Sequence, residues 1–134
     1  MGRPDLSGRW ALNREKSRLE IPMPDATEFL IEHREPQFHL KRTHVTGNAR
    51  DTFAIDLITN GPAVQLTHRG IDIQSRAYWE GDALVFDSAM GMGSERGTNI
   101  VRYELADGGR TFVAVEKVRF AGHTHTNRWV FDRQ

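Results

Sequence analysis

The chain of 134 residues contains no cysteine, and this absence removes several kinds of chemistry. Disulfide bonds, thiolate catalysis and cysteine-ligated zinc sites all require that side chain. No apolar run approaches the ~18–20 residues of a membrane-spanning helix, so we expect no membrane span. Charge of one sign is not in excess either, because 18 basic and 18 acidic side chains give a formal net charge of zero. Without a basic stripe, a nucleic-acid partner is not expected.

The N-terminus also lacks the apolar h-region of a signal peptide. Met1 to Asp5 read Met-Gly-Arg-Pro-Asp, so we expect no signal peptide in this chain. The compartment stays open: a soluble protein in the cytoplasm, or in the periplasm or outside the cell if a leader has been removed. The length suits one domain, and no composition shift or linker divides it, so we expect a single domain over residues 1–134.

A long helical pattern is missing, and alternation with a period of two takes its place. Phe53 and Ile55, for example, fall on one face of their segment. Turn residues such as Gly47-Asn48 and Asp107-Gly108-Gly109 separate such runs at regular spacing. The chain therefore predicts about ten short strands, with the proline-containing residues 14–27 as an exception. Residues 91–97 read as a glycine-rich loop, and Met90-Gly91-Met92-Gly93 at its start is either an ordinary hairpin loop, which we favour, or a gate at a mouth.

An all-β chain of this size and rhythm has two main solutions, a sandwich or a barrel. The hairpins are sequential, with no long crossover, and closure removes exposed strand edges. We therefore predict an all-β fold, a single closed antiparallel up-and-down β-barrel of about 8–10 strands. A barrel of that size has room inside for a small ligand.

One short motif near the N-terminus carries a family resemblance. Ser7-Gly8-Arg9-Trp10 is similar to the Gly-x-Trp pattern on the first strand of lipocalins and other calycins. The chain resembles the calycin superfamily, and within it the short bacterial lipocalin-like domains. The resemblance implies that Trp10 closes one end of the barrel, with a basic side chain of the last strand, Arg128 or Arg133, across its ring. It also implies carriage of a small apolar ligand, while some barrels of this kind are enzymes.

If the apolar members of each strand face inward, several polar residues face inward with them. Apolar residues then line one end of the strands and polar residues the other, which describes a cup with an apolar floor and a hydrogen-bonding mouth. The candidate catalytic residues are His44, His68 and Glu116, and the candidate ligand-binding residues are Arg42, Phe53, Trp79, Tyr103, His123 and His125.

The inward charges need partners. An arginine buried alone is costly, so an inward Arg42 predicts a nearby acid such as Glu116, or an acidic ligand. For Glu116 we expect an ion pair with Arg42 or Arg102. Asp51 is expected among the outer residues of its strand.

The histidine pair His123 and His125 leaves several interpretations open. The pair could be exposed, could bind a ligand, or could chelate a metal, since residues i and i+2 of a strand point to one side. Zinc usually needs a third protein ligand, which His44 or His68 would have to supply. We predict no metal site and no cofactor.

Three hypotheses for function follow. The first is a binding barrel for a small apolar or amphipathic molecule, monomeric or homodimeric. The second is a cofactor-independent lyase, isomerase or cyclase that uses a cavity histidine as acid/base, with Arg42 polarising a carbonyl. The third, ranked last, is haem or metal binding through histidine. No nucleophile elbow, phosphate loop or zinc-protease motif is present.

Overall fold

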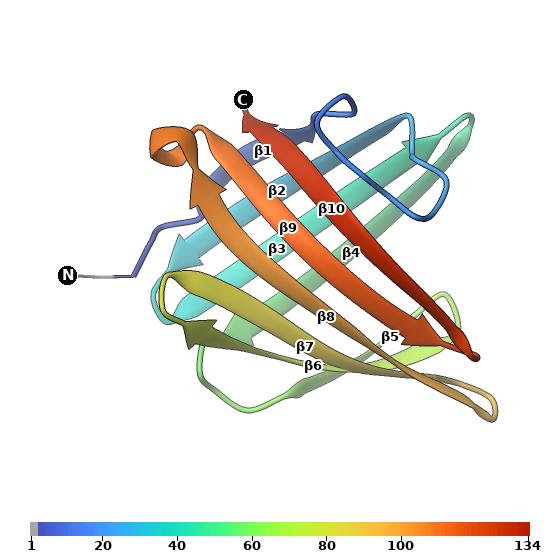
Figure 1. The fold of residues 1–134 in the computed structure, drawn as a ribbon. Coiled ribbons are helices and arrows are strands. Elements are labelled where there is room, and N and C mark those ends of the chain that lie inside the picture. Colours follow the sequence, from blue (N-terminus) through green and yellow to red (C-terminus); the bar gives the residue numbers. More distant parts are fainter. Residues whose placement is uncertain (1–2) are drawn as a thin grey trace.

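The computed structural model describes residues 3–134; Met1 and Gly2, part of the segment in which we expect no signal peptide, lie outside the described residues. Ten antiparallel strands follow one another along the chain (Figure 1): β1 Gly8–Leu12, β2 Ala26–Arg34, β3 Gln37–Thr46, β4 Ala49–Ile58, β5 Val64–His68, β6 Ile71–Glu80, β7 Ala83–Met92, β8 Glu95–Ala106, β9 Thr111–Phe120 and β10 His123–Arg133. A 3-10 turn, η1 Asp107–Gly109, joins β8 to β9. No helix of the described residues is long and apolar enough to cross a membrane.

The strands form a nearly closed up-and-down barrel, which confirms the predicted fold. Except for β4 and β5, each strand pairs with its neighbours in sequence, and β1 pairs with β10 to join the two ends of the chain. The period-two alternation is the cause: in β2, for example, Phe29 and Ile31 are buried while Glu28 and Glu32 are exposed. The inward residues form one continuous apolar core.

The barrel has one gap in its hydrogen-bonded ladder, between β4 and β5. These two strands stand at opposite ends of the sheet order. Side chains bridge the gap: Phe53 on β4 lies edge-to-face on His68 of β5, with ring centroids 5.2 Å apart. Asp51 also pairs with His68 and Arg69 across it.

One end of the barrel is closed around Trp10. This side chain is fully buried, packs on Phe112 at 5.3 Å between ring centroids, and donates from its indole nitrogen to the Leu6 carbonyl at 3.1 Å. The Arg133 guanidinium lies 4.2 Å from the centre of the Trp10 ring and donates to the Ser7 carbonyl. Arg133 is therefore the cation implied by the resemblance, and that expectation is confirmed.

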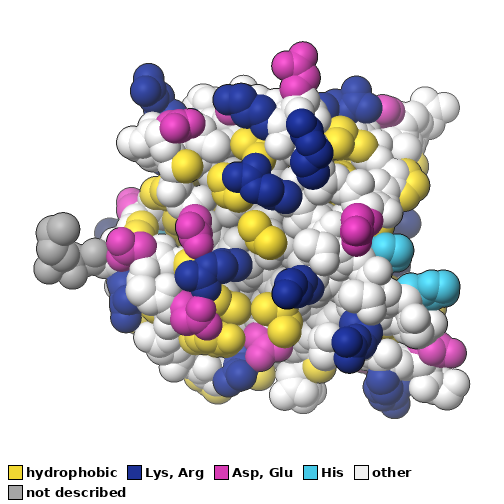
Figure 2. All heavy atoms as spheres, viewed as in Figure 1, with side chains coloured by type: hydrophobic (Ala, Val, Ile, Leu, Met, Phe, Trp, Pro, Cys, Tyr) yellow, Lys and Arg dark blue, Asp and Glu magenta, His cyan; other side chains and the backbone are white. Residues whose placement is uncertain are grey.

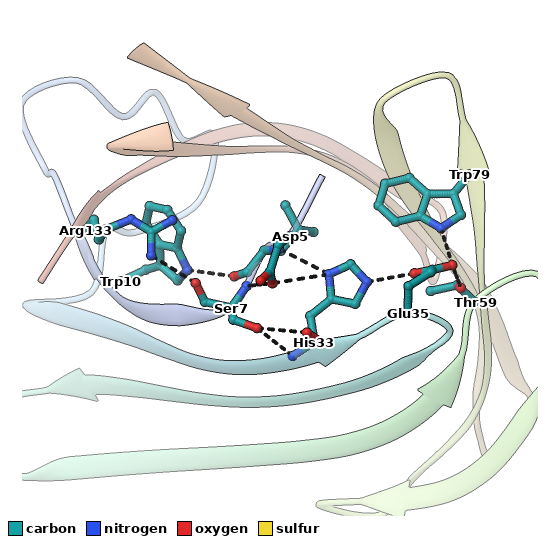
Figure 3. Close-up of polar contacts among 9 residues, drawn as sticks. Asp5, Ser7, Trp10, His33, Glu35, Thr59, Trp79 and Arg133 are labelled. Carbon is teal, nitrogen blue, oxygen red and sulfur yellow. Dashed lines mark hydrogen bonds and ion pairs between the residues drawn. The ribbon is translucent and has the colours of Figure 1, made fainter. Parts of the chain in front are cut away.

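A hydrogen-bond network completes the closed end (Figure 3). The buried His33 ring accepts from the Leu6 backbone N–H at Nδ1, so its proton sits on Nε2 and donates to Glu35 at 2.7 Å. Glu35 also accepts from the Thr59 hydroxyl and from the Trp79 indole. Burial opposes ionisation of Glu35, but these three donors outweigh it and hold its pKa below the ordinary value.

The structure contradicts the expectation for one segment between strands and agrees with the expectation for another. The expected glycine-rich loop over residues 91–97 is wrong, because β7 continues to Met92, β8 begins at Glu95 and only a tight turn lies between them. Residues 13–25 form no helix, in line with their prolines. Arg18 instead makes two backbone hydrogen bonds with Arg128, which places this segment, the strap, beside β10.

The outer face over β8, β9 and β10 mixes charges of both signs with separate hydrophobic side chains (Figure 2). Ile100 and Val115 are among the apolar residues exposed there, at 43% and 36%. No single-sign stripe crosses this view, as the balanced composition predicts.

Candidate functional site

An internal cavity of about 190 Å³ lies between the closed end and the turns at the other end of the barrel. Its wall is mainly apolar, with polar side chains at intervals. The lining residues are Phe29, Leu40, Arg42, His44, Phe53, Ile55, His68, Ile73, Ser75, Phe86, Ser88, Met90, Asn99, Val101, Tyr103, Ala114, Glu116, Trp129 and Phe131. The alternation within β3, β4, β8 and β9 aims these side chains at a common space.

A charged cluster occupies the part of the cavity beside the β4–β5 gap. Asp51 on β4 accepts from Arg42 at 3.2 Å, from Arg69 at 2.6 Å and contacts His68 Nε2 at 2.9 Å. Burial raises the pKa of Asp51, but hydrogen bonds from Arg69 and His68 and the Arg42 charge together hold it below its ordinary value. Asp51 therefore stays ionised and neutralises the arginine that points into the cavity.

His44 on β3 lines the cavity as a neutral side chain. Its ring stacks on Trp129 with centroids 5.5 Å apart, and its Nδ1 lies 2.6 Å from the Thr27 hydroxyl. Burial is the main cause that lowers the pKa of His44 to about 4, the Arg42 charge lowers it further, and Asp51 acts in the opposite direction. The imidazole is thus uncharged at neutral pH.

Glu116 on β9 is held by neutral donors. One oxygen accepts from the Asn127 amide and the Trp129 indole, both at 3.0 Å, and the other accepts from the Asn99 amide at 2.9 Å. Glu116 takes part in none of the ion pairs formed among residues 3–134. The expected ion pair of Glu116 with Arg42 or Arg102 is therefore wrong: Arg42 pairs with Asp51.

Two buried polar atoms in the described part of the chain have no hydrogen-bond partner, and both belong to this cavity. They are the Arg42 Nε–H group and the Asn99 Oδ1 atom. Buried groups of this kind are normally paired. The nearby Tyr103 hydroxyl stays protonated, because burial and then the Glu116 charge raise its pKa well above the ordinary value.

The strap covers a second, outer hollow that adjoins the cavity. Ile21, Pro22 and Pro24 of the strap line it together with His125, and it shares His44, Glu116 and Trp129 with the inner cavity. Asn127 ties the two regions together: its Oδ1 accepts from the Glu20 backbone N–H at 2.8 Å while its amide holds Glu116.

The structure brings most of the predicted site residues together and separates three of them. Arg42, His44, Phe53, His68, Tyr103 and Glu116 all line the cavity. His125 lines only the outer hollow, and His123 is exposed at the start of β10. Trp79 lies at the closed end, where its indole binds Glu35 (Figure 3). Among residues 3–134, no three His, Asp or Glu side chains gather closely enough to hold a metal ion.

Asn99 also lines the cavity, and Asp51 lies beside it in contact with Arg42 and His68, although neither is among the predicted site residues. Asp51 is expected on the outside, yet it shares the parity of Phe53 and Ile55, and in the structure it is half-buried against Arg42 and His68 of the cavity wall. Asn99 likewise shares the parity of Val101 and Tyr103. The alternation that identified the core therefore contained the signal for both residues.

No model of a known protein family matches the sequence, and no curated protein matches it. Several solved structures, however, do resemble this chain. The chain is similar to the REP1-NXSQ fatty acid transporter (TM-score 0.68, 18% identity, 96% of each chain covered). It is also similar to a SAHS (abundant heat soluble) protein from Ramazzottius varieornatus (0.69, 14%, 100% of this chain and 98% of that one). Human cRBP IV is a third such structure (0.64, 14%, 98% and 99%). At these identities the likeness concerns the fold alone, and it agrees with the predicted antiparallel up-and-down β-barrel.

Proposed function

We propose that this barrel binds a small, largely apolar molecule in its interior and acts as a carrier for it. The observation that supports the proposal most directly is the internal cavity of about 190 Å³ with mainly apolar walls and a few inward polar groups. Ligand sites have this composition because apolar contact supplies affinity and a few polar groups fix orientation. One of the similar barrels is named a fatty acid transporter, which agrees with carriage of an apolar ligand.

The two ends of the cavity have different roles in the proposal. Leu40 and Ile55 form part of the apolar floor, while His44, Arg42 and His68 form the polar mouth. A ligand would place its apolar part on the floor and its polar head toward these side chains. The closed end around Trp10 stabilises the barrel and takes no part in binding.

Filling the cavity tests the proposal. Ala114 is buried and lines the cavity, so Ala114→Phe places a ring in the ligand's space. The matched control is Val115→Phe, because Val115 is the next residue of β9 and points outward. With the neutral fluorescent probe 1-aminoanthracene, we expect Ala114→Phe to lose most binding and Val115→Phe to keep it.

Thermal unfolding of both variants checks that the barrel still folds. If Ala114→Phe does not fold, Val101→Phe fills the same cavity from β8, where the side chain is only half-buried. Probe binding that survives in a folded, cavity-filled variant would exclude the interior as the binding site.

One observation favours acid/base catalysis as a second candidate function. His68 lines the cavity and Asp51 lies 2.9 Å from its Nε2, and a carboxylate that orients an imidazole is a common arrangement for a general base. Exchange of the α-hydrogens of a small ketone with deuterated solvent would measure such an activity on a simple test substrate.

A further inference from the structure

The two unpaired polar atoms of the cavity indicate what kind of ligand head it accepts. Arg42 Nε carries a hydrogen and can only donate, whereas Asn99 Oδ1 can only accept. Both are buried, so neither is satisfied by bulk water, and both residues line the same cavity. A ligand that satisfies them must present one acceptor and one donor.

The orientation of the Asn99 amide is fixed by its neighbour. An ionised carboxylate only accepts hydrogen bonds, so the Asn99 NH₂ group must face Glu116, which it does at 2.9 Å. The carbonyl oxygen of Asn99 is then left without a partner. The cavity therefore offers an acceptor at this position and not a second donor.

The charges around the cavity disfavour an anionic ligand. Asp51 pairs with Arg42, and its second arginine partner, Arg69, is exposed to solvent and is not among the residues that line the cavity, so Arg42 is offset at the cavity wall by the Asp51 carboxylate. Glu116 is a carboxylate stabilised by neutral donors alone, and a second carboxylate in the same cavity would be repelled by it. His44 is uncharged at neutral pH and supplies no compensating cation.

We propose, building on the binding function proposed above, that the ligand is a neutral molecule with a head that both accepts and donates a hydrogen bond, such as an amide or an alcohol. The acceptor of this head pairs with Arg42 Nε and its donor pairs with Asn99 Oδ1. The cavity volume of about 190 Å³ limits the ligand to a small molecule.

A set of three ligands with the same eight-carbon chain tests the head group. Octanamide accepts and donates, N,N-dimethyloctanamide only accepts, and octanoate accepts and carries a charge. In competition with 1-aminoanthracene at pH 7.5, we expect octanamide to bind the wild-type protein roughly ten-fold more tightly than either of the others, the effect of one well-made buried hydrogen bond.

The variant Glu116→Gln should reverse the order of the amide and the acid. The Trp129 indole only donates, and Asn127 is held by Glu20, so the glutamine must keep its oxygen toward them. Its NH₂ group then faces Asn99, and the Asn99 amide turns over to accept from it. The cavity now presents the Asn99 NH₂ and has lost one negative charge, so octanoate should bind more tightly than octanamide. Glu32→Gln, an exposed residue of β2, is the control for the change in charge and should keep the wild-type order.

The outcomes separate this inference from the function on which it rests. The neutral-head inference is overturned if octanoate binds the wild type as tightly as octanamide. It is also overturned if a folded Glu116→Gln variant still binds octanamide more tightly than octanoate. In both cases the proposed carrier function is unaffected. If Glu116→Gln does not fold, the octanamide and N,N-dimethyloctanamide comparison on the wild type decides alone, since equal affinity removes any role for the Asn99 acceptor. If 1-aminoanthracene fails to bind the wild type and none of the three ligands binds by calorimetry, the carrier function itself fails.

Discussion

Replacing His44 should flatten the dependence of stability on mildly acidic pH. The pKa of His44 is about 4 in the folded barrel, against an ordinary value of 6.5. The unfolded chain therefore takes up a proton on this side chain near pH 6.5, while the folded chain does so only near pH 4. Between these values the unfolded state binds more protons, so the free energy of unfolding falls as the pH falls.

The expected size of the effect follows from the two pKa values. Between pH 7 and pH 5, this histidine should remove at most about 2 kcal/mol from the free energy of unfolding. The side chain is half-buried, and solvent screening reduces the figure from that limit. The titratable and charged groups around it are Arg42, His68 and Glu116 in the cavity, Asp51 beside the cavity and His125 in the outer hollow. The lowered pKa of Asp51 places its own titration below this window.

Urea unfolding at half-unit steps from pH 7 to pH 5 measures the effect. His44→Asn keeps a polar group near the Thr27 hydroxyl but does not titrate, so its stability should change much less over this range than that of the wild type. His123→Asn removes an exposed histidine of β10 and should leave the wild-type slope in place. A His44→Asn protein that loses stability as steeply as the wild type would refute the assignment of the proton uptake to this residue.

Two further predictions concern the closed end and the second candidate function. Trp10→Ala removes a fully buried indole and should lower the free energy of unfolding by about 3–5 kcal/mol. The affinity of the folded fraction for 1-aminoanthracene, measured at low temperature, should change little. A loss of binding free energy larger than the loss of unfolding free energy would contradict the division of roles between the two ends. If the barrel is an acid/base catalyst, the wild type should accelerate deuterium exchange into 2-octanone and His68→Gln should not, as followed by proton NMR; exchange at the buffer rate with wild type would reject that function.

The fold was predictable because the core and the turns carry strong local signals. Residues 111–120 are a continuous run rich in strand-favouring side chains, and β9 spans Thr111–Phe120. Closure through Trp10 and Arg133 followed from a motif and a general contact between a cation and an indole. The turn at residues 93–94 was harder, because glycines that read as a loop are accommodated within paired strands at Gly91 and Gly97.

The site was predictable in its members but not in their partners. Alternation says which face a side chain occupies, so it placed Arg42, His44, His68 and Glu116 inside. It says nothing about which strands lie opposite one another across the barrel. On the adjacent strand β3, the residue directly opposite Asp51 is His44, and Arg42 lies two positions from it, within reach of the Asp51 carboxylate. Asp51 contacts His68 only because β5 lies across the open gap from β4.

The two ends of the barrel use similar side chains for different purposes, which composition alone does not distinguish. At the closed end His33 stacks on Trp79, and Glu35 accepts from the Trp79 indole. At the mouth His44 stacks on Trp129, and Glu116 accepts from the Trp129 indole.

The difference between these two sets lies in what remains unpaired. Around His33, Glu35 and Trp79, the described side chains leave no buried polar atom without a partner, so the hydrogen bonding of this set is complete. Around the cavity, Arg42 Nε and Asn99 Oδ1 are both unsatisfied. A buried donor and acceptor left open cost stability, and that cost is recovered when a ligand supplies their partners. For this reason we assign stability to the first histidine, glutamate and tryptophan set and binding to the second.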